Sequence, residues 1–579
     1  MAVAEKEDLA ALSKPSQPGA RVWELLVVGL FLWFLAACLQ WKAGAYSAEF
    51  ASHPDEPAHY TTGVMIRDYI VSGHFSSPLA YAQNYYVHYP KVALGAWPPF
   101  FHFTEALWTT LFTASKPSVL LLEALLTAIV GTSLYWLLRK RYPARLAVLG
   151  GALFVALPLV QRSTLSVMAD MLVAVFIFWA MVFFARYLED GRTRDGMCFG
   201  LFTALAMATK PNGDALLLLP VIAFAMTGRW HLLFRRATVY AGLIILFIGV
   251  PFEIIAYRFI QRMGVPHLTL AEKFSLFLWL GHELLASLGW GLAAFFLLGL
   301  LVFVVQLVSS KEFDATLTVA LSLLISLWVF HTYTGIQDPR YEIFALPAAM
   351  LFIYSGFEWL VGRIASTKLP ATATAAVLGA IVAVVFFVQL WTVPQKPYWG
   401  FNEAAQDLMS DPAYSTANFL VVGNACGEGA FVTEVLMRDH RPGHAVFRGS
   451  KALLASNKWY ESTYQLRFPT DAGLRDFLDQ APISAIILDR GTSPLACGFP
   501  EGMIAEFNSV ERALVSDPHW TRQRTYPHSA GGNGSLALYT RIGSQPAGNL
   551  SVDMTNMLGK SMTYSGSDNQ EQNSPQGTK

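Results

Sequence analysis

Groups that can exchange protons or bind ions crowd into one stretch of this sequence, residues 43–116, between two long apolar segments. Asp55 and Glu56 stand side by side near its beginning. Neighbouring carboxylates are typical of a helix start, with Asp55 as the N-cap and Pro57 in the first turn. The same stretch also holds His53, His59, His88, Tyr89, Lys91 and His102. Ionisable groups near a low-dielectric surface can have shifted pKa values and bind ions or phosphate, so this loop is a candidate site.

A second carboxylate of interest is Asp170, which interrupts an otherwise apolar run from Leu165 to Ala185. An acidic residue in such a run suggests a function, here as a metal ligand or an acceptor contact. Alternatively, Asp170 lies just outside the hydrocarbon and caps a helix. Both interpretations stay open from the sequence.

The elements that must position these residues are mostly apolar. The chain of 579 residues is 54% hydrophobic and only 14% charged, whereas a soluble domain usually carries about a quarter charged residues. Its 41 Lys and Arg residues balance its 41 Asp and Glu residues, which argues against a nucleic-acid partner. Most of the chain is therefore expected to lie in a lipid bilayer.

Apolar runs near the length of a membrane span recur from Val22 to Thr392. We predict about eleven spans, at 22–41, 117–138, 146–161, 169–185, 197–209, 214–227, 238–256, 284–307, 315–333, 342–361 and 371–393. Short cytoplasmic loops keep Lys and Arg, and every second loop is basic if residues 1–21 are a cytoplasmic tail. The basic loops lie around Arg141, Arg194, Arg235, Lys311 and Arg363. This alternation requires Pro98 to Ala114 to be a half-buried helix on the outer face, and it leaves the C-terminus outside.

After Trp391 the apolar character falls away, and residues 394–397 are predicted to link the spans (22–394) to an outer domain, 395–542. Strand-like and helix-like segments alternate there, which favours an α/β fold. We expect strands at 418–422, 485–489 and 536–542, and helices at 429–438, 474–480 and 504–515. Residues 543–579 are rich in Ser, Gln, Asn and Gly and are expected to be disordered.

The glycine-rich segment from Gly423 to Gly429 follows a predicted strand. It could cradle a nucleotide, but it lacks the spacing of a phosphate-binding loop, and a simple glycine-rich turn is the preferred interpretation. Cys426 and Cys497 lie in the same predicted domain. They could form a disulfide in an oxidising compartment or stay as two buried thiols.

The order of these features resembles the GT-C glycosyltransferases, nearest to the protein O-mannosyltransferase and aminoarabinose lipid A transferase branch. The resemblance covers roughly residues 20–395. It is carried by an acidic pair just past the first span, an aromatic-flanked Pro-Pro, an acidic residue opening a later span and an Arg-Tyr entering a late one. In this sequence these are Asp55-Glu56, Trp97-Pro98-Pro99-Phe100, Ala169-Asp170-Met171 and Arg340-Tyr341 before Leu346-Pro347.

The resemblance implies a sugar donor on a polyprenyl phosphate, attacked at the outer face of the membrane by a hydroxyl of a lipid, glycan or protein. It implies inversion at the anomeric carbon, Asp55 as general base with Glu56 beside it, and a multi-pass protein of the bacterial cytoplasmic membrane. A positioned carboxylate base is worth about 10²–10⁴-fold in rate. The departing phosphate needs cations or a divalent metal ion beside it, and Glu56, His53 and His102 are the candidate ligands.

Basic residues on the predicted outer face are the candidate phosphate contacts: Lys91, Lys210, Arg258, Arg262 and Arg340. Arg340 is preferred, because an arginine at the mouth of a span could pair with Asp338 or hold a phosphate with two hydrogen bonds. It could also simply extend to the lipid headgroups. Tyr341, His59 and Tyr89 complete the predicted substrate contacts, together with Lys91 and Asp170.

One position departs from the aminoarabinose branch, which commonly has Lys or His directly before the paired prolines, where this sequence has Trp97. That branch's ligands and substrates are therefore not carried over. Two other classes remain as alternatives. A transporter or lipid flippase would place polar residues near mid-membrane, and a non-catalytic scaffold presenting the outer domain would not need so polar a first loop.

Overall fold

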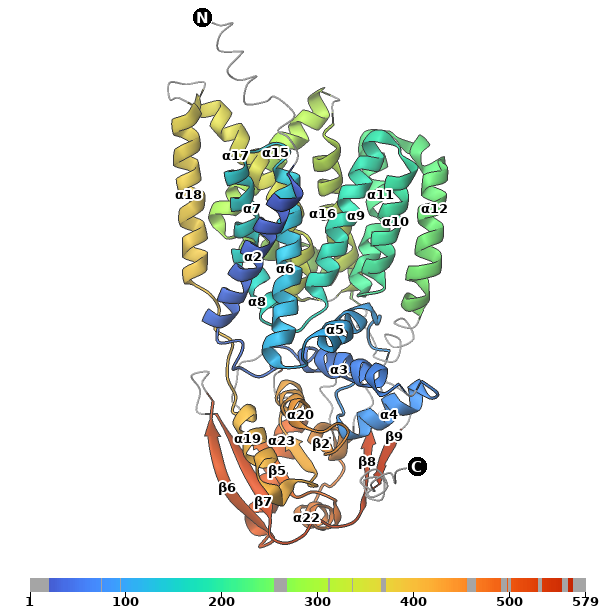
Figure 1. The fold of residues 1–579 in the computed structure, drawn as a ribbon, viewed down its shortest axis with the longest axis vertical. Coiled ribbons are helices and arrows are strands. Elements are labelled where there is room, and N and C mark those ends of the chain that lie inside the picture. The colour runs from blue at the N-terminus through green and yellow to red at the C-terminus, as the bar shows by residue number, and fades with distance from the viewer. Residues whose placement is uncertain are drawn as a thin grey trace, which may run out of the picture.

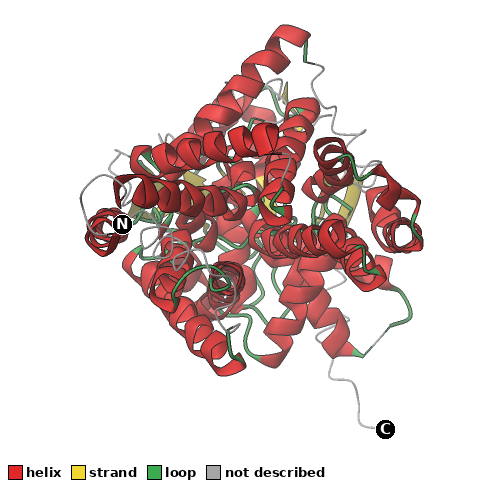
Figure 2. Ribbon diagram, turned by 90° about the horizontal axis from the view of Figure 1, so that it is seen from above, coloured by secondary structure: helices red, strands yellow, loops and turns green. Residues whose placement is uncertain are grey.

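The computed structural model describes residues 20–73, 75–93, 95–254, 268–310, 313–335, 337–365, 371–455, 465–490, 497, 501–528, 534–553 and 561–565. Long helices form a bundle at one end of the molecule and a mixed domain occupies the other (Figure 1). Three short helices of the first loop lie between the two parts. In a view along the bundle, the helices pack beside one another and the strands lie behind them (Figure 2).

All eleven predicted apolar segments contain helix. The bundle consists of α2 (Val22–Lys42), α6 (Lys116–Leu138), α7 (Ala144–Ala156), α8 (Pro158–Thr164), α9 (Asp170–Asp190), α10 (Thr193–Met207), η1 (Pro211–Leu217), α11 (Leu219–Thr227), η2 (Trp230–Phe234), α12 (Arg236–Ile244), η3 (Ile245–Gly249), α14 (Leu270–Leu288), α15 (Trp290–Ser310), α16 (Ala315–Thr334), η4 (Pro339–Phe344), α17 (Leu346–Ala365) and α18 (Ala371–Trp391).

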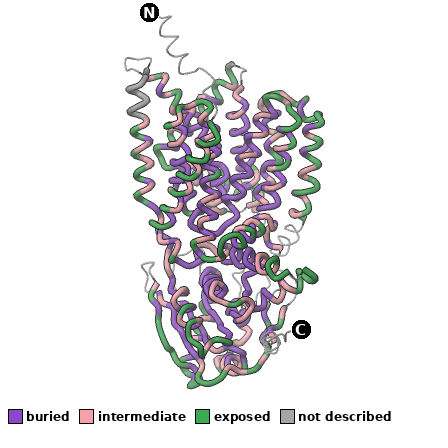
Figure 3. The backbone as a smooth tube through the Cα atoms, viewed as in Figure 1, coloured by how far each residue is buried: buried purple, intermediate pink, exposed green. Residues whose placement is uncertain are grey.

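Within the described residues, six helices are long and apolar enough to span a membrane, and the pair α7–α8, bent by 64°, would make a seventh. Of the remaining predicted spans, 197–209 and 214–227 correspond to shorter helices, 342–361 to a helix that carries Glu358 and Arg363, and 371–393 to α18. The apolar window of α9 is 83% buried, whereas that of the helix from Arg236 to Ile254 is only 17% buried. Helix α9 is therefore central, and exposed residues concentrate on outer helices such as α12 and α18 (Figure 3). Many of the exposed residues are large and apolar, as a lipid surround requires.

The predicted span at 284–307 corresponds to α15, but its predicted start lies within the preceding helix α14. Two helices, α14 and α15, meet there at Gly289, whose φ of +74° favours glycine. Helix α14 starts at residue 270 with a capping box between Thr269 and Glu272, and its polar positions hid it from an apolar scan.

The first loop folds into α3 (Glu56–Ser72), α4 (Pro78–His88) and α5 (Phe100–Leu111). Helix α5 occupies the segment expected to lie along the membrane surface, and Phe103, Leu107 and Leu111 are exposed on one side of it. The N–H of Phe100 donates to the carbonyl of Ala208 (3.1 Å), which fastens α5 to the bundle. Helices α3 and α5 pack together and cover the end of the bundle.

The C-terminal domain is an α/β unit. Its five-stranded sheet has the order β2-β1-β5-β7-β6, with β1 parallel to β2 and β5, and β7 antiparallel to β5 and β6. Cys426 and Cys497 form a disulfide. The elements are α19 (Phe401–Ser410), η5 (Pro412–Tyr414), β1 (Phe419–Val422), α20 (Ala425–Arg438), β2 (Val446–Arg448), α21 (Gly449–Ala452), β3 (Leu454–Ala455), β4 (Gln465–Leu466), α22 (Asp471–Gln480), β5 (Ala485–Asp489), α23 (Glu501–Ser516), β6 (Trp520–Pro527) and β7 (Ser535–Arg541).

The tail expected to be disordered contains an antiparallel hairpin, β8 (Asn549–Asp553) with β9 (Ser561–Ser565). Leu550, Val552 and Tyr564 are buried, and the Tyr564 hydroxyl accepts a hydrogen bond from Asn418 Nδ2 (3.0 Å). The expectation of disorder is wrong for these ten residues, because apolar side chains alternate within a polar composition. Residues 554–560 and 566–579 lie outside the described part.

Candidate active site

Asp55 stands at the start of α3, where the first loop meets the end of the bundle. Its Oδ2 lies 3.3 Å from His53 Nδ1 and 3.6 Å from Arg340 Nη1. The Asp55 side chain is 18% exposed. Burial raises the pKa of Asp55, but the charge and hydrogen bond of His53, together with Arg340, outweigh it, and the pKa falls well below the usual range. Asp55 is therefore ionised at neutral pH.

Arg340 is oriented by its own turn. Asp338 caps η4, accepting from the backbone N–H of Arg340 (2.9 Å) and from its Nε (2.7 Å). This bond aims the guanidinium at Asp55. Arg340 Nη1 is buried, and among the described residues it has no hydrogen-bond partner. A cationic donor is thus held ready at the candidate base, which is the arrangement that an anion requires.

A second buried ion pair lies beside the first. Lys210 Nζ is 2.7 Å from Asp170 Oδ1, and both side chains are almost fully buried. The ammonium of Lys210 also sits 5.2 Å from the centroid of the Tyr341 ring, which stacks on His331 at 5.0 Å. The charges of Asp170 and Arg340 interact, so the two pairs form one group of alternating charges. Within the described residues, Asp170 Oδ2 has no partner.

His59 lies one turn after Asp55 on α3. Its Nδ1 is 3.0 Å from Nε2 of His102 on α5, and its ring stacks near Trp97, with centroids 4.4 Å apart. Burial and then the charge of His102 hold the pKa of His59 well below its ordinary value. Burial alone lowers the pKa of His102 to about 3. The two imidazoles are therefore neutral at pH 7 and share a hydrogen bond, and Trp97 is their packing partner.

Glu56 faces away from this group. Its Oε1 is 2.5 Å from Lys396 Nζ, and its Oε2 accepts from the N–H of Ser52 (2.9 Å). Its side chain is fully buried. Glu56 thus has a structural partner from the domain linker, and the charge pattern of the site does not include its carboxylate.

Lys91 and Tyr89 lie where the loop meets the C-terminal domain. Lys91 Nζ donates to the carbonyl of Pro54 (2.8 Å), next to Asp55. Burial, and then the charge of Arg448, lower the pKa of Lys91 well below its ordinary value. Tyr89 donates through its hydroxyl to Asp439, at the end of α20. Lys91 thus borders the site, and Tyr89 belongs to the docking contact.

The glycine-rich segment serves that same docking. A Cβ at Gly429 would lie 2.5 Å from both Lys91 Cε and Pro57 Cγ, so only glycine lets α20 approach the first loop this closely. Asn424 caps α20 by accepting from the N–H of Gly427 (2.9 Å). These contacts support the simple turn over a nucleotide cradle.

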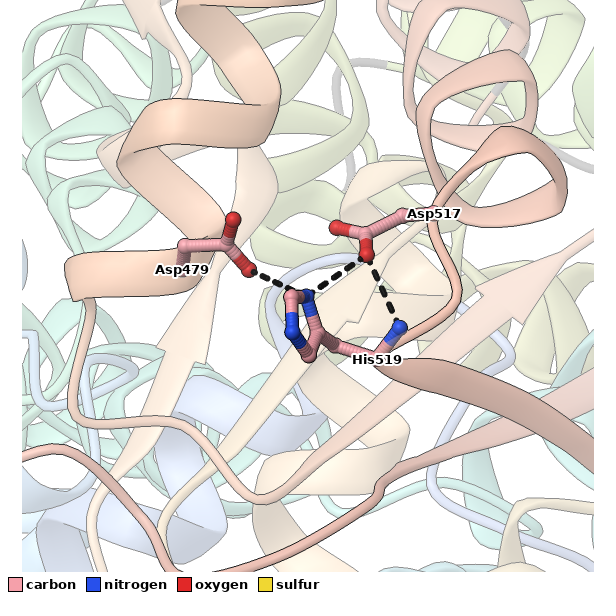
Figure 4. Close-up of side chains that lie close together, drawn as sticks. All are labelled: Asp479, Asp517 and His519. Atoms are coloured by element: carbon pink, nitrogen blue, oxygen red, sulfur yellow. Dashed lines mark hydrogen bonds and ion pairs between the residues drawn. The ribbon is translucent and has the colours of Figure 1, made fainter.

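The predicted metal ligands do not share a centre. Glu56 is bound by Lys396, His102 by His59, and His53 by Asp55. The one cluster of His, Cys, Asp and Glu ligand atoms found in the described residues is Asp479, Asp517 and His519 (Figure 4). Asp479 lies on α22, at the far end of the C-terminal domain (Figure 1), and Arg541 Nη1 is 3.9 Å from its carboxylate. In this arrangement Glu56, His53 and His102 each pair with another side chain, so these three residues do not form one metal centre.

The structure therefore brings Asp55, His53, His59, Asp170, Arg340 and Tyr341 together, with Lys91 at the border. Arg258 and Arg262 lie outside the described residues. Lys210, only one of several candidate cations in the sequence, is the partner of Asp170. The sequence analysis does not identify Lys396 or His331 as candidate site residues. The one sequence feature that pointed to Lys210 is its position within a short apolar stretch. Lys396 lies in a linker, and nothing in the sequence around it indicates a function.

Known structures share the fold of this chain. ArnT from Cupriavidus metallidurans in the apo state is 13% identical, with 90% of this chain and 97% of that chain covered and a TM-score of 0.55. The Archaeoglobus fulgidus oligosaccharyltransferase tethered with an acceptor peptide is 12% identical, covering 90% and 74%, with a TM-score of 0.53. AglB from the same organism, with an inhibitory peptide and a dolichol-phosphate, is 11% identical, covering 80% and 69%, with a TM-score of 0.51.

A sequence-family model of dolichyl-phosphate-mannose-protein mannosyltransferase matches residues 96–255. No curated protein sequence matches the chain. The shared architecture and the apolar helices define a multi-pass membrane protein with this fold. The chain thus has the fold of the GT-C membrane glycosyltransferases, and its residues 96–255 resemble the dolichyl-phosphate-mannose-protein mannosyltransferase family.

Proposed function

We propose that this enzyme transfers a sugar from a polyprenyl-phosphate-linked donor to a hydroxyl of a lipid, glycan or protein acceptor, with inversion and with Asp55 as general base. The observation that carries the proposal is the ionised Asp55 carboxylate held 3.6 Å from the guanidinium of Arg340. One group can accept a proton and the other can bind a phosphate, within the reach of a single sugar-phosphate.

The chemistry balances over these residues. Asp55 takes the proton of the acceptor hydroxyl as its oxygen bonds to the anomeric carbon. The bond from that carbon to the phosphate oxygen breaks, and the polyprenyl phosphate leaves with the electron pair. Arg340 Nη1 and the ammonium of Lys210 stabilise the negative charge on the leaving phosphate, because both are fixed cations in a buried site.

The comparisons support the donor class. The matched family acts with dolichyl-phosphate-mannose, and an oligosaccharyltransferase of the same fold binds a dolichol-phosphate. A second structure of that archaeal enzyme carries a tethered acceptor peptide. We extend the lipid-phosphate donor to this chain and keep the acceptor general. The enzyme would act at the outer face of a bacterial cytoplasmic membrane, with the first loop and the C-terminal domain outside.

The test is a transfer assay with the purified protein in nanodiscs and radiolabelled polyprenyl-phosphate sugars. The wild-type protein should release polyprenyl phosphate and label an acceptor fraction. Asp55→Asn should lower turnover by about 10²–10⁴-fold while donor binding persists, since an amide keeps the size but cannot take the proton. Near-normal turnover of Asp55→Asn would move the base elsewhere, with Asp170 the next carboxylate to test.

Binding of the lipid phosphate without transfer, in wild type and variant alike, would instead favour the flippase class. Failure to bind any polyprenyl phosphate would leave only a scaffold role for the bundle. Asp338→Asn provides a contrast with Asp55→Asn: it removes the carboxylate that orients Arg340 but leaves the proposed base, so it should weaken donor binding more than turnover.

A further inference from the structure

The linker between the last bundle helix and the C-terminal domain contains a lysine, Lys396, whose side chain is buried inside the protein. The backbone N–H of Lys396 donates to the carbonyl of Ala43 (2.9 Å), so the linker pairs with the end of α2. Lys396 Nζ reaches Glu56 Oε1 at 2.5 Å and the carbonyl of Leu165 at 2.9 Å. The two charged side chains are 2% and 0% exposed.

Glu56 joins three segments of the chain. It accepts from the N–H of Ser52 in the first loop (2.9 Å) and from the N–H of Val167 (3.4 Å), in addition to Lys396. Its neighbour in sequence is Asp55, the proposed base. Leu165 and Val167 belong to the turn that leads into Asp170. The Glu56–Lys396 pair therefore contacts the backbone just before both carboxylates of the site.

The surroundings of the pair hold it rigidly. Phe50 is fully buried, with Lys396 Nζ 5.2 Å and Lys116 Nζ 6.0 Å from its ring centroid. Glu49 accepts from the N–H of Trp399 (3.0 Å), just after the linker. Lys116, at the start of α6, pairs with Glu434 of α20 at 2.7 Å. The linker and α20 are thus fastened to the first loop by separate buried contacts.

A buried ion pair is a poor source of net stability, because both charges lose their hydration, and its best-attested use is to fix one arrangement among several. An apolar pair of the same volume would hold the linker against the loop equally well. A charged pair also requires one particular geometry. The Glu56 carboxylate has all of its hydrogen-bond donors only when Lys396, Ser52 and Val167 are placed around it together.

We propose that Lys396 is a positioning residue for the transfer reaction. By holding Glu56 it fixes the orientation of Asp55 and of the turn before Asp170, so that the C-terminal domain must be docked for the base to be aligned. The inference rests on the proposed function, because the effect on turnover presumes that Asp55 is the base. It assigns a role in catalysis to the linker of a domain that does not itself enter the site.

The test compares Lys396→Met with Lys116→Met. Both remove a buried ammonium beside Phe50 that pairs with a carboxylate, but only Lys396 contacts Glu56. Lys396→Met should lower kcat by about 10²-fold with the donor KM changed less than about threefold, because a misplacement near 1 Å has that effect on turnover. Lys396→Arg should restore most of kcat. Lys116→Met should keep kcat while lowering the thermal midpoint, since Glu434 retains Arg438 at 2.8 Å.

A second readout does not need activity. Amide hydrogen exchange should rise at residues 52–59 in Lys396→Met and stay at the wild-type level there in Lys116→Met. If Lys396→Met does not fold, the double variant Glu56→Gln with Lys396→Met replaces it, because it leaves no unpaired buried charge. Equal exchange at 52–59 in the two lysine variants, or equal kcat, overturns the positioning role. A wild-type protein without transfer activity overturns the proposed function instead, and the exchange measurement still decides the inference.

Discussion

At the scale of single residues, the site depends on the electrostatic setting of Asp55. Two side chains lower the pKa of one carboxylate: His53 by charge and hydrogen bond, and Arg340 by charge. Both favour the ionised form, which is the form a base needs. A base with a depressed pKa is weak in solution, so its effect must come from placement close to the acceptor hydroxyl.

This setting predicts a pH dependence. The pKa of Asp55 is depressed, so Asp55 is deprotonated at all pH values above its folded pKa, and the acid limb of kcat should lie below the ordinary aspartate value of about 3.9. His53→Asn removes the largest lowering influence and leaves burial, which raises the pKa. The acid limb of kcat should therefore move to higher pH.

The measurement is the pH profile of kcat for wild type and His53→Asn at saturating donor. His282→Asn is the control, because His282 is 68% exposed on α14 and pairs with Glu283 rather than with a site carboxylate. A profile of His53→Asn that superimposes on wild type would show that Asp55 does not titrate in the reaction.

Sequence reasoning selected Asp55 from its polar loop and the family resemblance, Asp170 because it interrupts an apolar run, and Arg340 because it stands at the mouth of a span. It could not find their partners. Lys210 and Asp170 are 40 positions apart, and Glu56 and Lys396 are 340 apart. Pairing over such distances depends on how helices pack, which no local spacing encodes. Glu56 was grouped with the catalytic and metal-binding residues because it follows Asp55, yet adjacent residues at a helix start point in different directions.

At the scale of elements, α15 and α17 make the closest contact of the bundle. A Cβ on Gly299 would overlap the carbonyl of Phe352, and one on Gly356 would overlap the carbonyl of Phe295. The two glycines therefore let the helix backbones touch, which is how small residues promote packing between helices in a membrane.

Gly299→Leu should separate these helices and destabilise the protein, by about 1–3 kcal/mol if the bundle responds as other overpacked interiors do. The measurement is the thermal midpoint in detergent. Gly242→Ala in α12 is the matched control, because nothing lies within 4 Å of the Cβ it would add, and it should leave the midpoint unchanged or slightly raised. Equal midpoints for the two variants would contradict tight packing at Gly299.

The elements that the sequence failed to predict share a cause. Helix α14 carries Glu272, Lys273, His282 and Glu283, so a scan for apolar runs passed over it and began its span at residue 284. The β8–β9 hairpin was hidden by a polar composition in the same way. In both cases the average hydropathy of the segment was low, although apolar residues recur at regular positions along it. The regular placement of apolar residues, and not their average number, determines which face is buried.

At the scale of the whole molecule, the orientation of the protein in the membrane remains a prediction, based on which loops are basic. It places Arg194 and its loop in the cytoplasm and the C-terminal domain outside. Single cysteines at two exposed positions, Thr193→Cys and Thr416→Cys, should react with a membrane-impermeant maleimide on opposite sides of sealed vesicles.

The labelling needs a background without the free thiols Cys38 and Cys198. Gly400, which follows the linker, is unsuitable for the outer position, since its φ is +87° and a Cβ there would lie 2.8 Å from Tyr526. Reaction of both cysteines on the same side would reverse or break the assigned alternation, and with it the placement of the site at the outer face.

The separation of Glu56 from Lys396 has a consequence for biosynthesis. The ribosome must add 340 residues after Glu56 before Lys396 exists. At ~5–20 residues per second this is a delay of roughly 17–68 seconds. During that interval the nascent first loop would carry a carboxylate with no counter-ion, and its completion would wait for the last third of the chain. An unfinished polypeptide that ends before Lys396 would therefore lack the ion pair that we propose aligns the base.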